Sequence, residues 1–318
     1  MQSPDTQNLL CDIGMPIIHR NSRYNCRVFL WNGQILLIRP KMHMADDGNY
    51  RESRWFNPWI RAGHTEEHAL PPFMHHVQRY APFGDAVLEF EDTKVAAEIC
   101  EELFAPMSPH LPLAISGNVE IFLNGSASHH ELNKLARRFE LILGATSKVG
   151  GLYLYANQMG CDGDRLYFDG SAIISLNGQL LAQSPQFSPK HVHVVTATVD
   201  LDLIQILRGN RPSFTNQAAA SSRVFPFEYA NIRVGDVRLC WPSGLSSQLP
   251  IPSPVIQPRY HAPAEEISLG PALWMWDYMR KSGASGLFLP LSGGLDSCAC
   301  ALIVYCMAKS VIEHAGTD

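Results

Sequence analysis

The stretch KVAAEICEELFAP, residues 94–106, decides the fold of this chain. An apolar run of strand type leads to Cys100, and Glu101-Glu102-Leu103-Phe104 then predicts the first turn of a helix. A thiol placed between a strand and a helix start lies near the positive end of the helix dipole, which favours the thiolate. Cys100 is therefore a candidate nucleophile, although a lone cysteine is more often a small buried apolar residue.

A second candidate lies in LLIRPKMHM, residues 36–44. Lys41 follows the end of a predicted strand, a position from which a charged side chain can project into a site. A lysine there can hold a neighbouring thiolate or stabilise the oxyanion of a tetrahedral intermediate. Taken alone, Lys41 would be interpreted as a solvated surface lysine, so its assignment depends on Cys100.

The segments around these two residues mix strands with helices. CRVFLW (26–31) and QILLIR (34–39) flank Asn32-Gly33, which predicts a β-hairpin with a type I′ turn. Alternating or apolar runs and helical spacing predict the remaining elements. The further strands are expected at 9–18, 86–90, 94–100, 119–124, 151–156, 171–176, 179–183 and 193–199, and the helices at 130–147 and 201–208. This mixture indicates an α/β domain with layered mixed sheets.

Composition excludes several classes of function. The chain has 318 residues, 46% of them hydrophobic, and a formal net charge of −5 without a dense Lys/Arg run, so we expect no nucleic-acid partner. No apolar stretch is expected to reach the roughly 20 residues that cross a bilayer, and the start lacks a secretory signal pattern. Eight cysteines without CxxC spacing favour reduced thiols in the cytosol or nucleus, and we expect a cytoplasmic location. The histidines lack metal-binding spacing, so no metal site is expected.

The composition changes after residue 235. Residues 236–263 are rich in Pro and Ser and predict a linker, which a helix at 264–283 follows. An apolar strand is then expected at 287–291, before SGGLDS (292–297) and a helix at 296–314. Glycines before a helix start let backbone N–H groups approach a phosphate. The loop matches neither the Walker A pattern nor GxGxxG.

Two family resemblances account for these motifs. SGGLDS resembles the SGGxDS loop of the ATP pyrophosphatases, which hold the pyrophosphate of ATP. RPKMHMADDGNYRESRWF (39–56), EICEELFAP (98–106), IFLNGSASHH (121–130) and QMGCDGDRLYFDGSAIISLNGQLLAQ (158–183) resemble the nitrilase superfamily, whose members use a Glu–Lys–Cys triad. The resemblance implies a nitrilase-like α-β-β-α sandwich over 1–235, incomplete at its N-terminus. After the linker, 264–318 would begin a Rossmann-like ATP-pyrophosphatase domain with its first strand, loop and helix.

The order of the two parts resembles the glutamine-dependent NAD synthetase family. The resemblance implies that the first domain hydrolyses glutamine and that the second adenylates deamido-NAD with ATP and Mg²⁺. Ammonia then displaces AMP to give NAD, and the complete enzyme would be a homo-oligomer. Residue by residue it implies catalytic roles for Cys100, Lys41 and Ser292, support from Glu52, glutamine binding by Tyr50, Ser128 and Lys134, and ATP binding by Pro290, Leu291, Ser292, Gly293, Gly294, Leu295, Asp296 and Ser297.

The chain departs from that family at both ends. The general-base Glu of the triad precedes the lysine in the family, whereas residues 1–40 contain Asp5 and Asp12 and no Glu. We therefore expect a fragment, truncated at both ends and inactive as it stands. A stand-alone nitrilase-type carbon-nitrogen hydrolase and a non-catalytic homologue are the alternatives.

Overall fold

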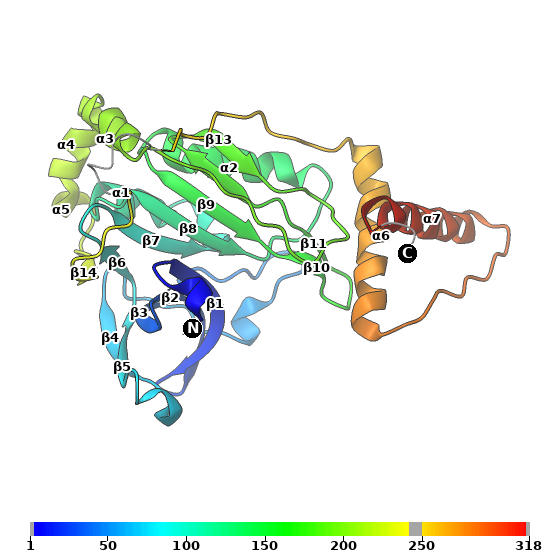
Figure 1. Ribbon diagram of the computed structural model, residues 1–318, viewed down its shortest axis with the longest axis horizontal. Coiled ribbons are helices and arrows are strands. Elements are labelled where there is room, and N and C mark those ends of the chain that lie inside the picture. Colours follow the sequence, from blue (N-terminus) through cyan, green and yellow to red (C-terminus); the bar gives the residue numbers. More distant parts are fainter. Residues whose placement is uncertain (1–2, 242–249, 316–318) are drawn as a thin grey trace.

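A computed structural model describes residues 3–241 and 250–315 (Figure 1). The smaller of its two main sheets has the strand order β1-β2-β3-β5-β4. These strands are β1 (Leu10–His19), β2 (Ser22–Trp31), β3 (Gln34–Pro40), β4 (Thr65–Ala69) and β5 (Tyr80–Gly84). Asn32 and Gly33 join β2 to β3 with φ of 46° and 83°. Because both central residues of a type I′ turn require positive φ, the predicted hairpin is confirmed.

The larger sheet has seven strands in the order β13-β12-β9-β8-β7-β6-β14. They are β6 (Ala86–Glu89), β7 (Lys94–Ile99), β8 (Ile121–Ser126), β9 (Leu152–Asn157), β12 (Ile173–Leu176), β13 (Gln179–Gln183) and β14 (Ala230–Arg233). The central strands β7, β8 and β9 are parallel. Phe29 and Leu37 from the small sheet pack with Leu88, Val95 and Ala97 from the large one. The two sheets therefore share one apolar layer.

The other face of the large sheet carries the helices α1 (His110–Ile115) and α2 (Lys134–Ser147). Phe122 and Tyr153 from the sheet pack there with Leu113, Phe139 and Ile142. The outer face of the small sheet packs instead against segments between β3 and β5, which contribute Trp59 and Leu70. Those segments contain the short 3₁₀ turns η2 (Glu52–Arg54) and η3 (Pro72–Met74), while η1 (Pro4–Thr6) precedes β1. Within 3–241, the layers thus run helix, sheet, sheet.

The remaining helices lie at opposite ends of this sandwich. The helices α3 (Asp202–Gly209), α4 (Pro212–Ala219) and α5 (Ser221–Val224) lie at one end of Figure 1, and α6 (Pro263–Ser282) and α7 (Leu295–Ala315) at the other. There α6 lies beside a two-stranded ribbon, β10 (Met159–Cys161) and β11 (Tyr167–Asp169). Leu273 of α6 is buried with Tyr167 and Phe187. The helix is therefore packed on the first part of the chain.

Several elements differ from the sequence-based expectations. The helix expected at 130–147 begins at Lys134, because Asn133 has a φ of 62° and interrupts helical geometry. No strand forms at 193–199, where Val195, Ala197 and Val199 pack on the outside of the large sheet without joining a ladder. The strand expected at 287–291 is also absent, since no described strand lies beside it. The strands β4, β5, β10, β11 and β14 were not predicted, because their short runs carry no clear alternation.

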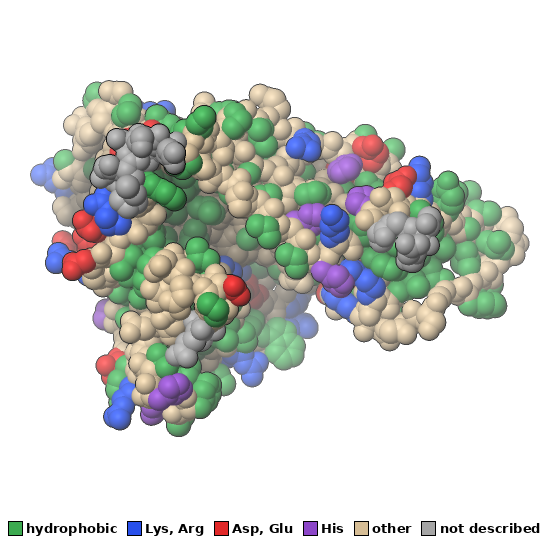
Figure 2. All heavy atoms as spheres, viewed as in Figure 1, with side chains coloured by type: hydrophobic (Ala, Val, Ile, Leu, Met, Phe, Trp, Pro, Cys, Tyr) green, Lys and Arg blue, Asp and Glu red, His purple; other side chains and the backbone are tan. Residues whose placement is uncertain are grey.

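The helix α7 shows that one expectation was wrong, namely that no apolar stretch reaches the length needed to cross a bilayer. Residues Leu295–His314 are long and apolar enough to cross a membrane by length and composition, a test that the core helix of a soluble protein also passes. Apolar side chains such as Leu302 and Tyr305 are exposed on it, and Figure 2 shows hydrophobic side chains gathered at this end. A helix of a parallel α/β unit has this character because it buries its faces against a sheet.

Candidate active site

Cys100 occupies a tight turn at the end of β7. Its φ of 45° lies in the left-handed region, which is strained for a residue with a side chain and is often found at functional sites. Its backbone N–H donates to Asn124 Oδ1 at 3.0 Å. The residues that follow form only η4 (Cys100–Leu103), a 3₁₀ turn of four residues. The predicted helix start is therefore a single 3₁₀ turn, too short for a helix dipole, and the left-handed backbone distinguishes this cysteine.

The buried carboxylate of Glu102 stabilises the turn at Cys100. Glu102 forms an ion pair with Arg39 of β3, and both side chains are at most 1% exposed. Glu102 also accepts hydrogen bonds from the N–H groups of Ile99 (2.6 Å) and Met42 (2.5 Å). Burial raises the pKa of Glu102, although the Arg39 guanidinium and these N–H groups act in the opposite direction. The pair joins the cysteine turn to the segment of Lys41.

Lys41 leaves the end of β3 and points inward. Its side chain is 2% exposed, and its Nζ lies 2.5 Å from Glu52 Oε2. Glu52 also accepts from Asn25 Nδ2 at 2.7 Å and from the Ala45 N–H at 2.9 Å. A buried ammonium requires such a partner, because an isolated charge is costly to remove from water. Glu52 therefore fixes the Lys41 ammonium at this position, and its supporting role in catalysis stays a prediction.

One cavity of about 550 Å³ brings these residues together. Cys100, Lys41, Glu52 and Tyr50 all line it. Its other lining residues are Gly14, Asn25, Arg27, Ala45, Asn49, Arg51, Trp55, Phe56, Ile99, Gly125, Ser126, Ala127 and Gln158. The loops at the ends of β3, β7 and β8 thus meet around a single cysteine, which suits attack on a small substrate.

Of the three predicted glutamine-binding residues, Tyr50 lines this cavity. The Tyr50 hydroxyl donates to the Ala127 carbonyl at 2.9 Å, and burial raises its pKa. Ser128 is buried, and its N–H donates to Asn157 Oδ1 at 2.8 Å. Lys134 is the first residue of α2, with its Nζ 3.4 Å from Glu131 Oε1. Tyr50 lies on the wall of the cavity. Ser128 follows the lining residue Ala127 and Lys134 begins α2, and neither of them lines the cavity.

Two contributors had gone unnoticed in the sequence. Arg27 lines the cavity, held by Asp12 through an Nε–Oδ1 contact of 2.7 Å, and its guanidinium covers Gly125 so closely that a Cβ there would collide with it. No motif marks Arg27, because strand alternation alone decides which way it points. Glu102 could have been found from the sequence, because it lies two residues after Cys100 in the motif EICEELFAP.

The predicted ATP loop lies apart from this cavity. Pro290 to Ser297 connects α6 to α7 at the end of the molecule farthest from α3–α5 (Figure 1). Gly293 has a φ of 79° and open space on the side where other residues carry a Cβ, and Ser297 Oγ donates to the Gly294 carbonyl at 3.0 Å. An open glycine turn before a 21-residue helix fits a phosphate. Among the described residues, no group of three metal-ligating side chains occurs.

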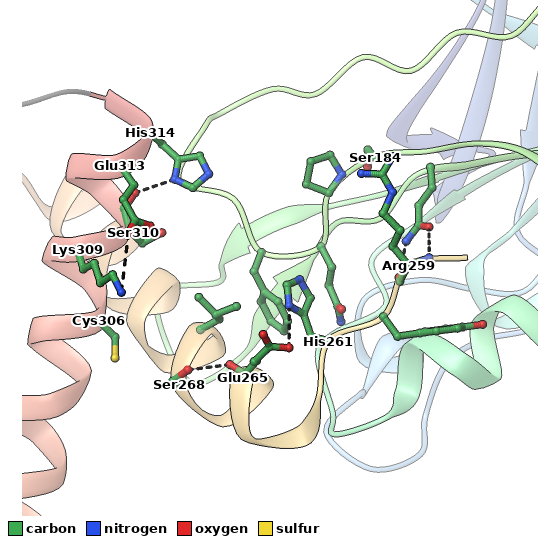
Figure 3. A pocket seen from close by; sticks show the side chains of 16 residues that line it. Ser184, Arg259, His261, Glu265, Ser268, Cys306, Lys309, Ser310, Glu313 and His314 are labelled. Carbon is green, nitrogen blue, oxygen red and sulfur yellow. Dashed lines mark hydrogen bonds and ion pairs between the residues drawn. The ribbon is translucent and has the colours of Figure 1, made fainter. Parts of the chain in front are cut away.

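A second cavity, of about 670 Å³, lies between α6, α7 and the segment after β13 (Figure 3). It contains none of the predicted site residues. Several of its charged side chains already face each other, with Lys309 Nζ 3.9 Å from Glu313 Oε1 and His261 Nδ1 3.6 Å from Glu265 Oε2. Although this cavity is larger, the cavity of Cys100 is the one with a nucleophile beside a buried cation.

The carbon-nitrogen hydrolase family matches residues 1–208, and the chain therefore belongs to this family. The nitrilase-like fold expected from the motifs is thereby confirmed. Within this class, the chain is 51% identical over 315 residues to the glutamine-dependent NAD(+) synthetase of Bos taurus, covering 98% of this chain and 43% of that protein. It is 50% identical over 321 residues to the glutamine-dependent NAD(+) synthetase of Saccharomyces cerevisiae, covering 99% and 44%.

Solved structures give the same result. A glutamine-dependent NAD(+) synthetase from Cytophaga hutchinsonii superimposes with a TM-score of 0.69 at 25% identity, covering 98% of this chain and 40% of that one. A carbon-nitrogen hydrolase from Helicobacter pylori shares the fold, with a TM-score of 0.52 at 16% identity over 70% of this chain and 73% of that one. The chain spans less than half the length of the curated relatives it matches.

Proposed function

We propose that this chain carries the glutaminase half of a glutamine-dependent NAD synthetase and the first part of its ATP-dependent half. One observation carries the proposal: a cavity with Cys100, Lys41 and Glu52 and a glycine loop before α7 occur on the same chain. The identity of about half to such synthetases over nearly the whole chain supports it. A stand-alone hydrolase would not require the SGGLDS loop.

The cavity supports amide hydrolysis through a thioester. The Cys100 thiolate attacks the side-chain amide carbon of glutamine, and a C–S bond forms. The Lys41 ammonium, fixed by Glu52 at 2.5 Å, stabilises the negative charge that develops on the amide oxygen. The C–N bond then breaks and the nitrogen leaves as ammonia after taking a proton. Water cleaves the thioester, which gives glutamate and restores the thiol.

Transfer of the Cys100 thiol proton to a base is the step for which this chain is least equipped. Among the described lining residues, Glu52 is the one carboxylate, and three donors already hold it. A carboxylate engaged in this way accepts the thiol proton poorly. We therefore propose that the 318-residue chain alone turns glutamine over slowly.

The second half of the proposal concerns the glycine loop. Backbone N–H groups around Gly293 and Gly294, with the Ser292 and Ser297 hydroxyls, would hold the pyrophosphate of ATP. Asp296, in the first turn of α7, would face the Mg²⁺ that accompanies ATP and neutralises phosphate charge. ATP would adenylate deamido-NAD, and ammonia from the first site would displace AMP to give NAD. We place this activity in the cytoplasm, and the eight free thiols support that location.

Substrate-protected labelling tests the glutaminase half. Purified chain is treated with iodoacetamide in the presence and absence of glutamine, and the alkylated cysteine is identified by mass spectrometry. We expect glutamine to slow modification of Cys100 and to leave the exposed Cys298 unaffected. Asparagine serves as the control ligand. Equal modification of Cys100 with and without glutamine would contradict the proposal.

A further inference from the structure

A buried carboxylate on α6 reaches into the loop that precedes α2. Glu266 is 3% exposed, and its Oε2 lies 3.0 Å from His130 Nε2 and 3.1 Å from the backbone nitrogen of Asn133. The two contacts join positions more than 130 residues apart in the sequence. The helix approaches so closely that a Cβ on Gly270 would lie 3.1 Å from His130 Nδ1.

Glu266 supplies what the start of α2 lacks. Asn133 precedes the helix with a φ of 62°, and its own side chain makes no capping hydrogen bond. Asn tolerates this left-handed conformation better than most residues, but its backbone N–H at the helix start still needs an acceptor. The Glu266 carboxylate satisfies the Asn133 N–H, and negative charge at a helix start is favourable. The conformation of the loop, and with it the position of Lys134, thus depends on α6.

The other side of the same loop contacts the cavity wall. His129 approaches the Tyr50 hydroxyl through its backbone nitrogen at 3.1 Å and its Nδ1 at 2.7 Å. Tyr50 in turn donates to the Ala127 carbonyl. Residues 127–134 therefore lie between Tyr50 of the Cys100 cavity and Glu266 of α6.

The helix α6 is itself fixed at a second point. Asp277 Oδ2 accepts from the Cys161 N–H at 2.7 Å, and Lys281 Nζ donates to the Cys161 carbonyl at 2.5 Å. These contacts fix α6 near its C-terminal end, and Glu266 fixes it near its start.

We propose that Glu266 is a positioning residue for the Cys100 cavity and that it acts on the cavity through residues 127–134. The inference rests on the proposed glutaminase function. Removal of the Glu266 carboxylate should release residues 127–134 from α6 and thereby weaken binding of a ligand shaped like glutamine. The reactivity of the Cys100 thiol should be unchanged.

Two measurements on Glu266→Ala test this. Hydrogen–deuterium exchange should become about tenfold faster in residues 127–134, the effect expected from losing hydrogen bonds to a buried charge. Labelling of Cys100 by 6-diazo-5-oxo-L-norleucine should need about tenfold more reagent for its half-maximal rate, with the maximal rate and the iodoacetamide rate within about twofold of wild type. Glu266→Gln keeps one acceptor oxygen and should restore part of both effects.

The neighbouring Glu265→Gln is the matched control, because this side chain is exposed on the same helix and its polar partners are His261 and Ala262, outside residues 127–134. It should behave as wild type in both measurements. If Glu266→Ala does not fold, Glu266→Gln carries the same test with a smaller expected change. Unchanged exchange in residues 127–134 would overturn the inference. Labelling of the wild type that does not saturate would instead contradict the glutaminase proposal, and exchange would still decide the role of Glu266.

Discussion

The cavity of Cys100 and the loop of Ser292 differ in how their surroundings hold them. Around Cys100, side chains from β3, β7 and the segments after them interlock through the buried pair Arg39–Glu102 and the contact of Lys41 with Glu52. Around Ser292, the described hydrogen bonds stay within six residues, and the loop is exposed. The first site is therefore shaped by tertiary structure, and the second has only the geometry that its own turn provides.

The largest expected effect concerns turnover at the better-formed site. The 318-residue chain should release glutamate from glutamine about 10²–10⁴-fold more slowly than a protein of its relatives' full length that carries this sequence, because general acid–base help contributes about that factor. Glutamate is measured in a coupled assay, with Cys100→Ala as background. Release at the rate of the longer protein, abolished by Cys100→Ala, would show that Glu52 or another described group suffices as base.

The buried pair behind the cavity should dominate stability. Glu102→Ala leaves the Arg39 guanidinium without its main partner, which is expected to cost about 3–5 kcal/mol of unfolding free energy. Urea unfolding followed by circular dichroism measures it. The double variant Arg39→Met with Glu102→Met should recover only part of the loss, because the main charge pair is removed together while Asp85, 3.5 Å from Arg39, loses its own partner. A loss below about 1 kcal/mol for the single variant would mean that the turn does not depend on this pair.

A substitution of Lys41 tests whether this lysine stabilises the oxyanion of the tetrahedral intermediate. In the longer protein, Lys41→Met should lower glutamate release by about 10²–10³-fold, the range for removal of one oxyanion donor. Glu101→Gln provides a control, because Glu101 neighbours Cys100 while the ion-pair partner of Lys41 Nζ is Glu52. Turnover within about threefold of wild type for Lys41→Met would remove this lysine from the mechanism.

The smallest effect is expected at the glycine loop. Ser292→Ala should change the unfolding free energy by less than about 0.5 kcal/mol, because its hydroxyl contacts are local and exposed. The same urea experiment measures it beside Glu102→Ala. A loss approaching that of Glu102→Ala would show that the loop is as firmly held as the cavity, and the contrast between the two regions would fail.

Different parts of the fold and the site could be predicted from the sequence, for physical reasons. The hairpin at Asn32-Gly33 was predictable because its turn requires local backbone chemistry, and Cys100 and Lys41 because they end apolar runs. The strand expected at 287–291 is absent because a strand forms only beside another strand, and the local sequence pattern does not show whether one is present. Arg27 and the contact of Glu266 with His130 depend on packing between distant segments, which no single motif records.

We propose that two separate sites on this chain serve one synthesis, and an assay that follows glutamate and pyrophosphate together in the longer protein tests this. We expect Cys100→Ala to abolish glutamate release while pyrophosphate release continues when ammonia is supplied. Ser292→Ala should stop pyrophosphate release while glutamate release persists. Loss of both products in Cys100→Ala despite added ammonia, or pyrophosphate release at the normal rate in Ser292→Ala, would show that the two sites do not work as proposed.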